Sequence, residues 1–137
     1  MRRLVAAGIG VVATLGTIGI AAPAQAATTA AKPFELIYGN SFYTGTVNFS
    51  NRSVTATGEV KSTVGGGCRF GEVTAFVGDK GYPVGRTRSV CDGDAVVMPI
   101  TSTADVPGGP TSVVLTLCAV DSHGSVTPLR STSRIAR

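Results

Sequence analysis

SVTATGEVK, Ser53–Lys61, alternates along its whole length between two kinds of residue. One set of alternate positions holds the apolar and glycine residues Val54, Ala56, Gly58 and Val60, and the other holds hydroxyl and charged residues. Successive residues of a β-strand point to opposite faces, so the alternation predicts a strand with one face in a core and the other in water.

Short apolar or alternating runs recur along the chain between clusters of Gly, Pro, Asn, Asp and Ser, and no segment has helical periodicity. The run Ser112–Val120 is apolar on both faces, which predicts a central strand. We expect an all-β fold: a two-sheet antiparallel sandwich of immunoglobulin-like shape, with a small β-barrel as the alternative. The expected strands are Phe34–Tyr38, Phe42–Phe49, Ser53–Lys61, Arg69–Val77, Tyr82–Val90, Ala95–Thr101, Ser112–Val120 and Ser125–Arg130.

The first residues are typical of a secretory signal peptide. Two arginines precede an uncharged stretch, residues 4–22, and Ala24-Gln25-Ala26 matches the small-residue cleavage pattern. Glycines dilute the stretch, which favours a cleaved signal over a retained membrane anchor. We therefore expect a signal peptide at residues 1–26, a flexible tail at residues 27–33 and one secreted, extracellular domain at residues 34–137.

The charge of the mature chain is small. The full sequence carries a net charge of +4, which falls to +2 without Arg2 and Arg3. That bias is too weak to indicate nucleic acid as a partner, and no membrane span is expected after cleavage.

Two connections carry turn signals, and one long loop is expected. Asp92-Gly93 predicts a type I′ hairpin turn, because both of its central residues need positive φ. The segment Asp121–Gly124 matches a type I turn, with Asp first and Gly fourth. The longest loop is expected at Thr101–Ser112, and the final residues 130–137, with three arginines, are expected to fray.

Two of the three cysteines can be paired by register. If Asp79 and Lys80 form the tip of a hairpin, facing residues have numbers that sum to 159, which sets Cys68 opposite Cys91. Facing residues of an antiparallel pair are close enough for a disulfide, and closing this loop is worth about 3 kcal/mol in the chain-entropy model. One bulge would separate the two thiols and a second would restore the pairing, so the other two connectivities stay open.

Under this pairing Cys118 is an unpaired thiol. It lies within the most apolar expected strand, where burial raises a thiol pKa and blocks access, so we expect an inert core residue. A reactive nucleophile or an intermolecular bond is the alternative.

We expect no catalytic residue, no metal and no cofactor. His123 is the chain's one histidine, and a turn such as Asp121-Ser122-His123 cannot converge as a triad must. Asp92 and Asp94 lack the remaining ligands of a calcium loop. Glu35, Glu59 and Glu72 are available for glycosidase chemistry, but their spacing brings no two together.

The most suggestive surface is basic. In the register above, Arg69, Arg86 and Arg88 share one face of the hairpin, on a strand that resembles a sheet edge guarded by charge. The patch is a solubility device or a site for an anionic cell-surface polymer.

Several motifs together resemble a loose group of small secreted β-proteins from high-GC Gram-positive bacteria. They are the leader, SVTATGEV, the cysteines of GGGC and SVC, and VPGGP before VVLTLC. The resemblance implies a sandwich and a bond between the first two cysteines, and it implies no reaction. In size and export the chain also looks like the apoproteins of secreted enediyne antibiotics and like secreted subtilisin inhibitors.

We therefore expect a secreted, non-enzymatic binding or interaction module, with loop Thr101–Ser112 as its presenting element. Its partner is unknown, and an extracellular protein or an anionic polymer would fit. The alternatives are a protease inhibitor that presents an extended loop and a small hydrolase that uses His123.

Overall fold

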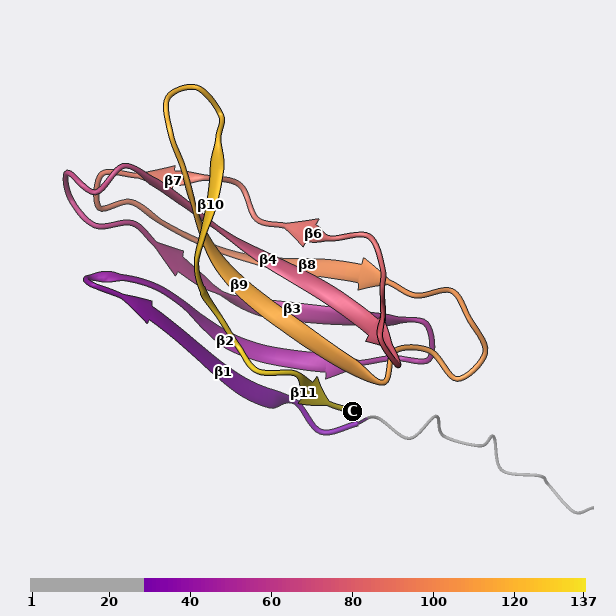
Figure 1. Ribbon diagram of the computed structural model, residues 1–137. Helices are drawn as coiled ribbons and strands as arrows, with labels where there is room; N and C mark the ends of the chain where they lie inside the picture. The colour runs from indigo at the N-terminus through magenta and orange to yellow at the C-terminus, as the bar shows by residue number, and fades with distance from the viewer. Residues whose placement is uncertain (1–28) are drawn as a thin grey trace, which may run out of the picture.

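The computed structural model describes residues 29–137, so the expected signal peptide lies outside the described residues. Residues 29–137 form two antiparallel sheets packed face to face (Figure 1). The predicted all-β sandwich is therefore confirmed. Within this part of the chain no helix is long and apolar enough to cross a membrane.

Sheet A is regular. Its four strands pair in the order β1-β2-β3-β8, and their registers run without a shift. Alternate side chains of each strand point into the core, as the alternation in Ser53–Lys61 predicted. The strand bounds are β1 Lys32–Tyr38, β2 Ser41–Phe49, β3 Ser53–Lys61 and β8 Ala95–Thr103.

Sheet B is irregular at both edges. Its centre is the pair β4, Cys68–Val77, and β9, Ser112–Val120. Two strands pair with β9 on the far side, namely β10, Val126–Ser131, and β11, Ile135–Ala136. Three short strands line β4: β5 Lys80–Gly81, β6 Gly85–Arg86 and β7 Val90–Cys91.

The predicted strand Tyr82–Val90 is wrong, because the returning arm of the hairpin is broken into those three short strands. The turn lies at Gly78-Asp79, one residue earlier than predicted, since Val77 faces Lys80. The register then shifts by one residue before Arg86, which faces Glu72, and by one more before the cysteines. Proline has no N–H to donate, so Pro83 cannot continue the ladder.

A buried serine of the other sheet repairs this break. The Ser102 hydroxyl, in β8, accepts the Ala75 N–H at 2.9 Å and donates to the Pro83 carbonyl at 2.7 Å. Just past the break, Gly85 of β6 comes so close to β8 that an added Cβ would lie 2.4 Å from the Thr101 carbonyl oxygen. The two sheets are thus joined along this edge.

The core is centred on Tyr43. Its ring is fully buried, meets the Phe34 ring edge to face at 4.8 Å, and lies against Gly71 of β4. A Cβ at Gly71 would be 2.6 Å from the Tyr43 ring, so only glycine allows this approach. The Tyr43 hydroxyl is buried without a hydrogen-bond partner, and burial raises its pKa.

The Asp92-Gly93 turn has the predicted conformation, with φ of 50° and 86°. Its role differs from the prediction. It joins β7 of sheet B to β8 of sheet A, so it is a crossover between the sheets and not a hairpin.

Contacts hold both ends of the described range, residues 29–137, against the rest of the domain. The C-terminal segment does not fray, because Ile135 pairs with Val113 and the Arg137 N–H donates to the Thr111 carbonyl. At the other end of the described range, β1 begins at Lys32, within the expected tail. The Lys32 ammonium donates to the Ala136 carbonyl.

We expect Gly71→Ala to lower the free energy of unfolding by about 2–3 kcal/mol, because the new methyl overlaps the Tyr43 ring. Tyr43→Phe should leave it unchanged or raise it by about 1 kcal/mol, because it removes an unpaired buried hydroxyl. Urea unfolding measures both. In a Tyr43→Leu background the Gly71→Ala change should cost far less, and equal costs in the two backgrounds would contradict the contact.

Ser102→Ala should lower the free energy of unfolding by about 2–3 kcal/mol and speed hydrogen exchange at the Ala75 amide, because two buried backbone groups lose their partner. Thr103→Ala, on the exposed face of the same strand, is the control and should change stability by less than about 0.5 kcal/mol. An Ala75 amide protected equally in both variants would refute the bridge.

Candidate functional site

The predicted disulfide is present. Cys68 and Cys91 face each other in the register of β4 and β7, their Cα atoms are 4.0 Å apart, and their sulfurs are bonded. The turn lies one residue earlier than the sequence predicts, but the two register shifts in the returning arm restore the predicted pairing of Cys68 with Cys91. The bond fastens the end of sheet B's broken edge, two residues before Gly93.

Cys118 is a free thiol and is 1% exposed. It faces Phe70 and Pro128 on the outer side of sheet B. Burial raises its pKa to about 12, and the charge and hydrogen bond of the Glu72 carboxylate add to this effect, against a smaller opposing effect of Arg86. The thiol is therefore protonated at neutral pH and is a poor nucleophile.

The predicted basic patch does not form as one surface. Arg86 faces Glu72, and its Nε donates to that carboxylate at 2.7 Å. Arg69 lies three residues from Glu72 on the same regular strand, so it points to the opposite face from Arg86. The arginines separate because the register shifts by one residue before Arg86. The exposed Arg88 does not join Arg69 and Arg86 into one surface.

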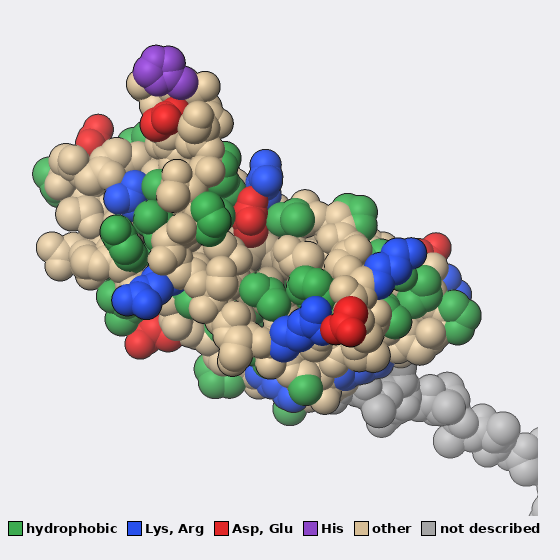
Figure 2. Space-filling view, in the orientation of Figure 1, with side chains coloured by type: hydrophobic (Ala, Val, Ile, Leu, Met, Phe, Trp, Pro, Cys, Tyr) green, Lys and Arg blue, Asp and Glu red, His purple; other side chains and the backbone are tan. Residues whose placement is uncertain are grey.

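Basic side chains gather instead at the end of the sandwich where the described chain starts (Figure 2). There they hold loops and the C-terminal residues. Arg52 pairs with Asp105, Arg134 donates to the Gly78 carbonyl at 2.8 Å, and Arg137 donates to the Gly108 carbonyl at 2.6 Å.

His123 stands at the exposed tip of the hairpin between β9 and β10 (Figures 1 and 2). The Asp121 carboxylate accepts the backbone N–H groups of His123 at 2.8 Å and of Ser125 at 2.9 Å, so it closes the turn. The histidine thus projects away from the sheets. Among residues 29–137 no three His, Cys, Asp or Glu side chains lie close enough to share a metal ion.

The long loop is a closed turn. β8 continues to Thr103, Gly109 donates its N–H to the Val106 carbonyl at 3.0 Å, and the Ala104 N–H donates to the Arg52 carbonyl at 2.8 Å. Gly109 and Pro110 are buried. The loop therefore presents a short tip and not an extended segment.

The outer face of sheet A carries few charged residues. Among the outward-pointing residues of its four strands, only Glu35, Glu59 and Lys61 are charged, and all three lie toward the β1–β2 turn. Threonines dominate the remainder. They are Thr44, Thr46, Thr55, Thr57, Thr101 and Thr103.

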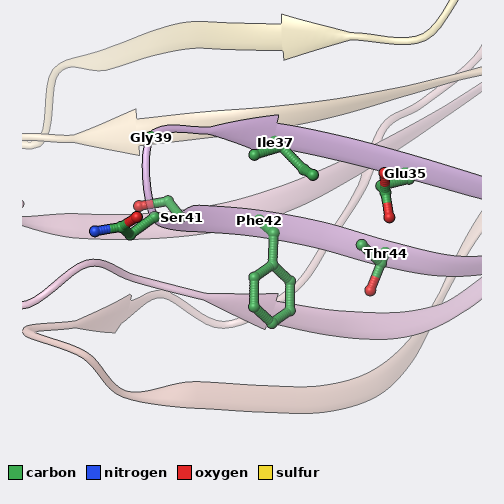
Figure 3. A pocket seen from close by; sticks show the side chains of 7 residues that line it. Glu35, Ile37, Gly39, Ser41, Phe42 and Thr44 are labelled. Atoms are coloured by element: carbon green, nitrogen blue, oxygen red, sulfur yellow. The ribbon is translucent and has the colours of Figure 1, made fainter.

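A hollow of about 280 Å³ opens on this face beside the β1–β2 turn (Figure 3). Two cross-strand pairs build it, Ile37 with Phe42 and Glu35 with Thr44. Ile37 is 52% exposed although it is a large apolar residue. The lining residues of this first hollow are Glu35, Ile37, Gly39, Asn40, Ser41, Phe42 and Thr44.

The floor of the first hollow is held rigidly. Ser41 is fully buried, and its hydroxyl accepts the Thr63 N–H at 3.1 Å and bonds the Thr63 hydroxyl at 2.8 Å. This contact ties the β1–β2 turn to the segment that follows β3. The shape of the hollow therefore depends on two elements and not on one mobile turn.

A second hollow, of about 330 Å³, adjoins the first. The two share Asn40, and Lys61 of the second faces Phe42 of the first in the register of β2 and β3. Val64, which is 80% exposed, stands at its rim. The lining residues of this second hollow are Asn40, Lys61, Ser62, Thr63, Val64 and Gly93.

Sheet A also places two carboxylates, Glu35 and Glu59, in one row across its strands, which their spacing in the sequence does not predict. Glu35 and Glu59 face Thr44 from its two sides, so they lie two strand spacings, or about 10 Å, apart. Neither forms an ion pair with any residue of the range 29–137. The strand order β1-β2-β3 would have revealed this row, but residue spacing alone does not.

Comparison with known proteins returned no matching family model, no matching curated protein and no matching solved structure.

We expect Cys118 to resist thiol reagents such as DTNB at pH 8 in the folded protein and to react fully in guanidinium chloride, because the folded thiol is buried and protonated. Glu72→Gln should accelerate labelling near pH 10, because it removes the charge that raises the thiol pKa. Cys118→Ala gives the background signal. Fast labelling of the folded wild-type chain would show that the thiol is accessible.

Proposed function

We propose that the mature chain is a secreted, non-enzymatic binding module whose ligand occupies the first and second hollows. One observation carries the proposal. The exposed Ile37 and the half-buried Phe42 present apolar surface in a concavity beside the carboxylate of Glu35, which has no ion-pair partner among residues 29–137. Apolar side chains and a few polar groups converging in a hollow are the usual composition of a ligand site.

The rigidity of the surroundings supports this proposal. The first hollow lies on the regular strands of sheet A, and Ser41 fastens its turn to Thr63. Gly93 of the second hollow follows Cys91, which the disulfide holds. A site that is already ordered loses little conformational entropy on binding.

Export is part of the proposal. The leader pattern of residues 1–26 is that of a cleaved signal peptide. The disulfide between Cys68 and Cys91 fits an oxidising compartment outside the cytosol.

The other candidate functions have weaker support. Loop Thr101–Ser112, as a presenting element or an inhibitory segment, is a closed turn with buried glycine and proline. A hydrolase would need groups that converge on His123, which projects alone into solvent. An anionic polymer would need the arginine patch that the register divides.

The proposal predicts where a ligand acts on the chain. A panel of neutral oligosaccharides, acidic oligosaccharides, and short basic and acidic peptides is added to ¹⁵N-labelled protein, and amide shifts are followed. At least one panel member should shift the amides of Gly39, Asn40 and Phe42, because they surround the first hollow. Phe42→Ala should abolish these shifts, because it removes half of the apolar pair.

Val126→Ala is the matched control, because it removes exposed apolar surface from β10 on the other sheet. It should leave the shifts unchanged. Shifts that cluster elsewhere, or that survive Phe42→Ala, would rule out the hollows as the binding site.

A further inference from the structure

We infer that the ligand is a neutral oligosaccharide, with one sugar ring lying on Ile37 and Phe42 while Glu35 and Asn40 bind its hydroxyl groups. The inference rests on the proposed function, because it assigns a ligand class to the same two hollows.

The apolar part of the first hollow suits the C–H face of a sugar ring. Ile37 and Phe42 face each other across β1 and β2, so their Cβ atoms lie about 5 Å apart and both side chains lie on the outer face of sheet A, with the Phe42 ring extending away from Ile37 (Figure 3). The face of an aromatic ring carries partial negative charge and attracts the partially positive C–H groups of a sugar.

The polar part suits the ring's hydroxyl groups. Glu35 accepts hydrogen bonds only, Asn40 both donates and accepts, and the Thr44 hydroxyl does both. Hydrogen bonds from a hydroxyl to a carboxylate are about twice as strong as neutral ones. Glu35 has no cationic partner in the described chain, whereas the Glu72 carboxylate is occupied by Arg86, so the Glu35 oxygens are available to a ligand.

The charges around the first hollow favour a neutral ligand. Glu35 and Glu59 lie on both sides of Thr44 and would repel an acidic polymer. Lys61 faces Phe42 on the other side and lines the second hollow, where it would repel a basic ligand. A ligand that crosses both hollows therefore meets both signs of charge.

The position of the hollow disfavours a peptide. β2 is paired on both sides, with β1 and with β3, so its backbone N–H and C=O groups are already bonded. β1 is the edge strand of sheet A, so a peptide that extends the sheet would pair along the outer edge of β1, whereas the hollow opens on the face of the sheet. Sugar hydroxyl groups need side-chain partners only.

The second hollow implies a ligand longer than one ring. It begins at Asn40, where the first hollow ends, and offers the apolar Val64 and the polar Lys61 and Thr63. A chain of sugar rings would place successive rings in the two hollows.

Isothermal titration against neutral hexasaccharides tests the inference, with cellohexaose, maltohexaose, laminarihexaose and the hexamer of N-acetylglucosamine as probes. Hexagalacturonate and hexalysine are the charged comparisons. At least one neutral hexamer should bind with a Kd of about 1 mM or tighter, and its disaccharide should bind at least about tenfold more weakly.

The variants separate the two parts of the site. Phe42→Ala should weaken binding of the neutral hexamer at least about tenfold, and the isosteric Glu35→Gln about fivefold, whereas Val126→Ala should change it less than about twofold. Both site residues point outward from sheet A, and an unchanged urea midpoint in each variant checks that the fold is intact.

The same probes are also added to ¹⁵N-labelled protein. If only hexagalacturonate or hexalysine binds and shifts the amides around the first hollow, the saccharide inference is overturned and the proposed function stands. If no probe shifts them, both are overturned.

Discussion

The contact of the Tyr43 ring with Gly71 sets how sheet A lies on sheet B. The ring is fully buried at the centre of the core, and the missing side chain at Gly71 lets β4 approach it. Because side chains alternate along a strand, an inward Tyr43 forces its neighbours Phe42 and Thr44 outward. The same contact that closes the core therefore places the residues of the first hollow on the opposite face.

Sheet A and sheet B differ in regularity and in the features they carry. Sheet A keeps an unbroken register and carries the candidate site. Sheet B has a broken edge, where Pro83 interrupts the backbone hydrogen bonds. The Ser102 hydroxyl bonds the Ala75 N–H and the Pro83 carbonyl there, and the disulfide holds the end of this edge at Cys91. The irregular edge is tolerable because side-chain and covalent links replace the missing backbone pairing.

Much of the fold could be predicted from periodicity. Strands Ser53–Lys61 and Ser112–Val120 have the predicted bounds, because their patterns are long and uninterrupted. The prediction for the returning arm of the hairpin was wrong. A register shift of one residue cannot be recognised from the sequence of a short polar segment that contains Pro83 and Gly85. The same shift moved Arg86 to the other face and removed the predicted patch. β11 was missed because two residues are too short for an alternation.

The candidate site depends on strand order, which is why residue spacing did not predict it. Glu35, Phe42 and Glu59 come from three strands and meet only because β1, β2 and β3 are neighbours in one register.

The two ends of the described chain lie close together. Lys32 of β1 contacts Ala136 near the two ends of the described range, and both residues are at the end of the sandwich remote from the β1–β2 turn (Figure 1). A short linker could therefore join residue 29 to residue 137, and new ends could be opened at the exposed Ser122-His123 tip. A circularly permuted or surface-immobilised form of this domain would keep its hollows turned toward the solution.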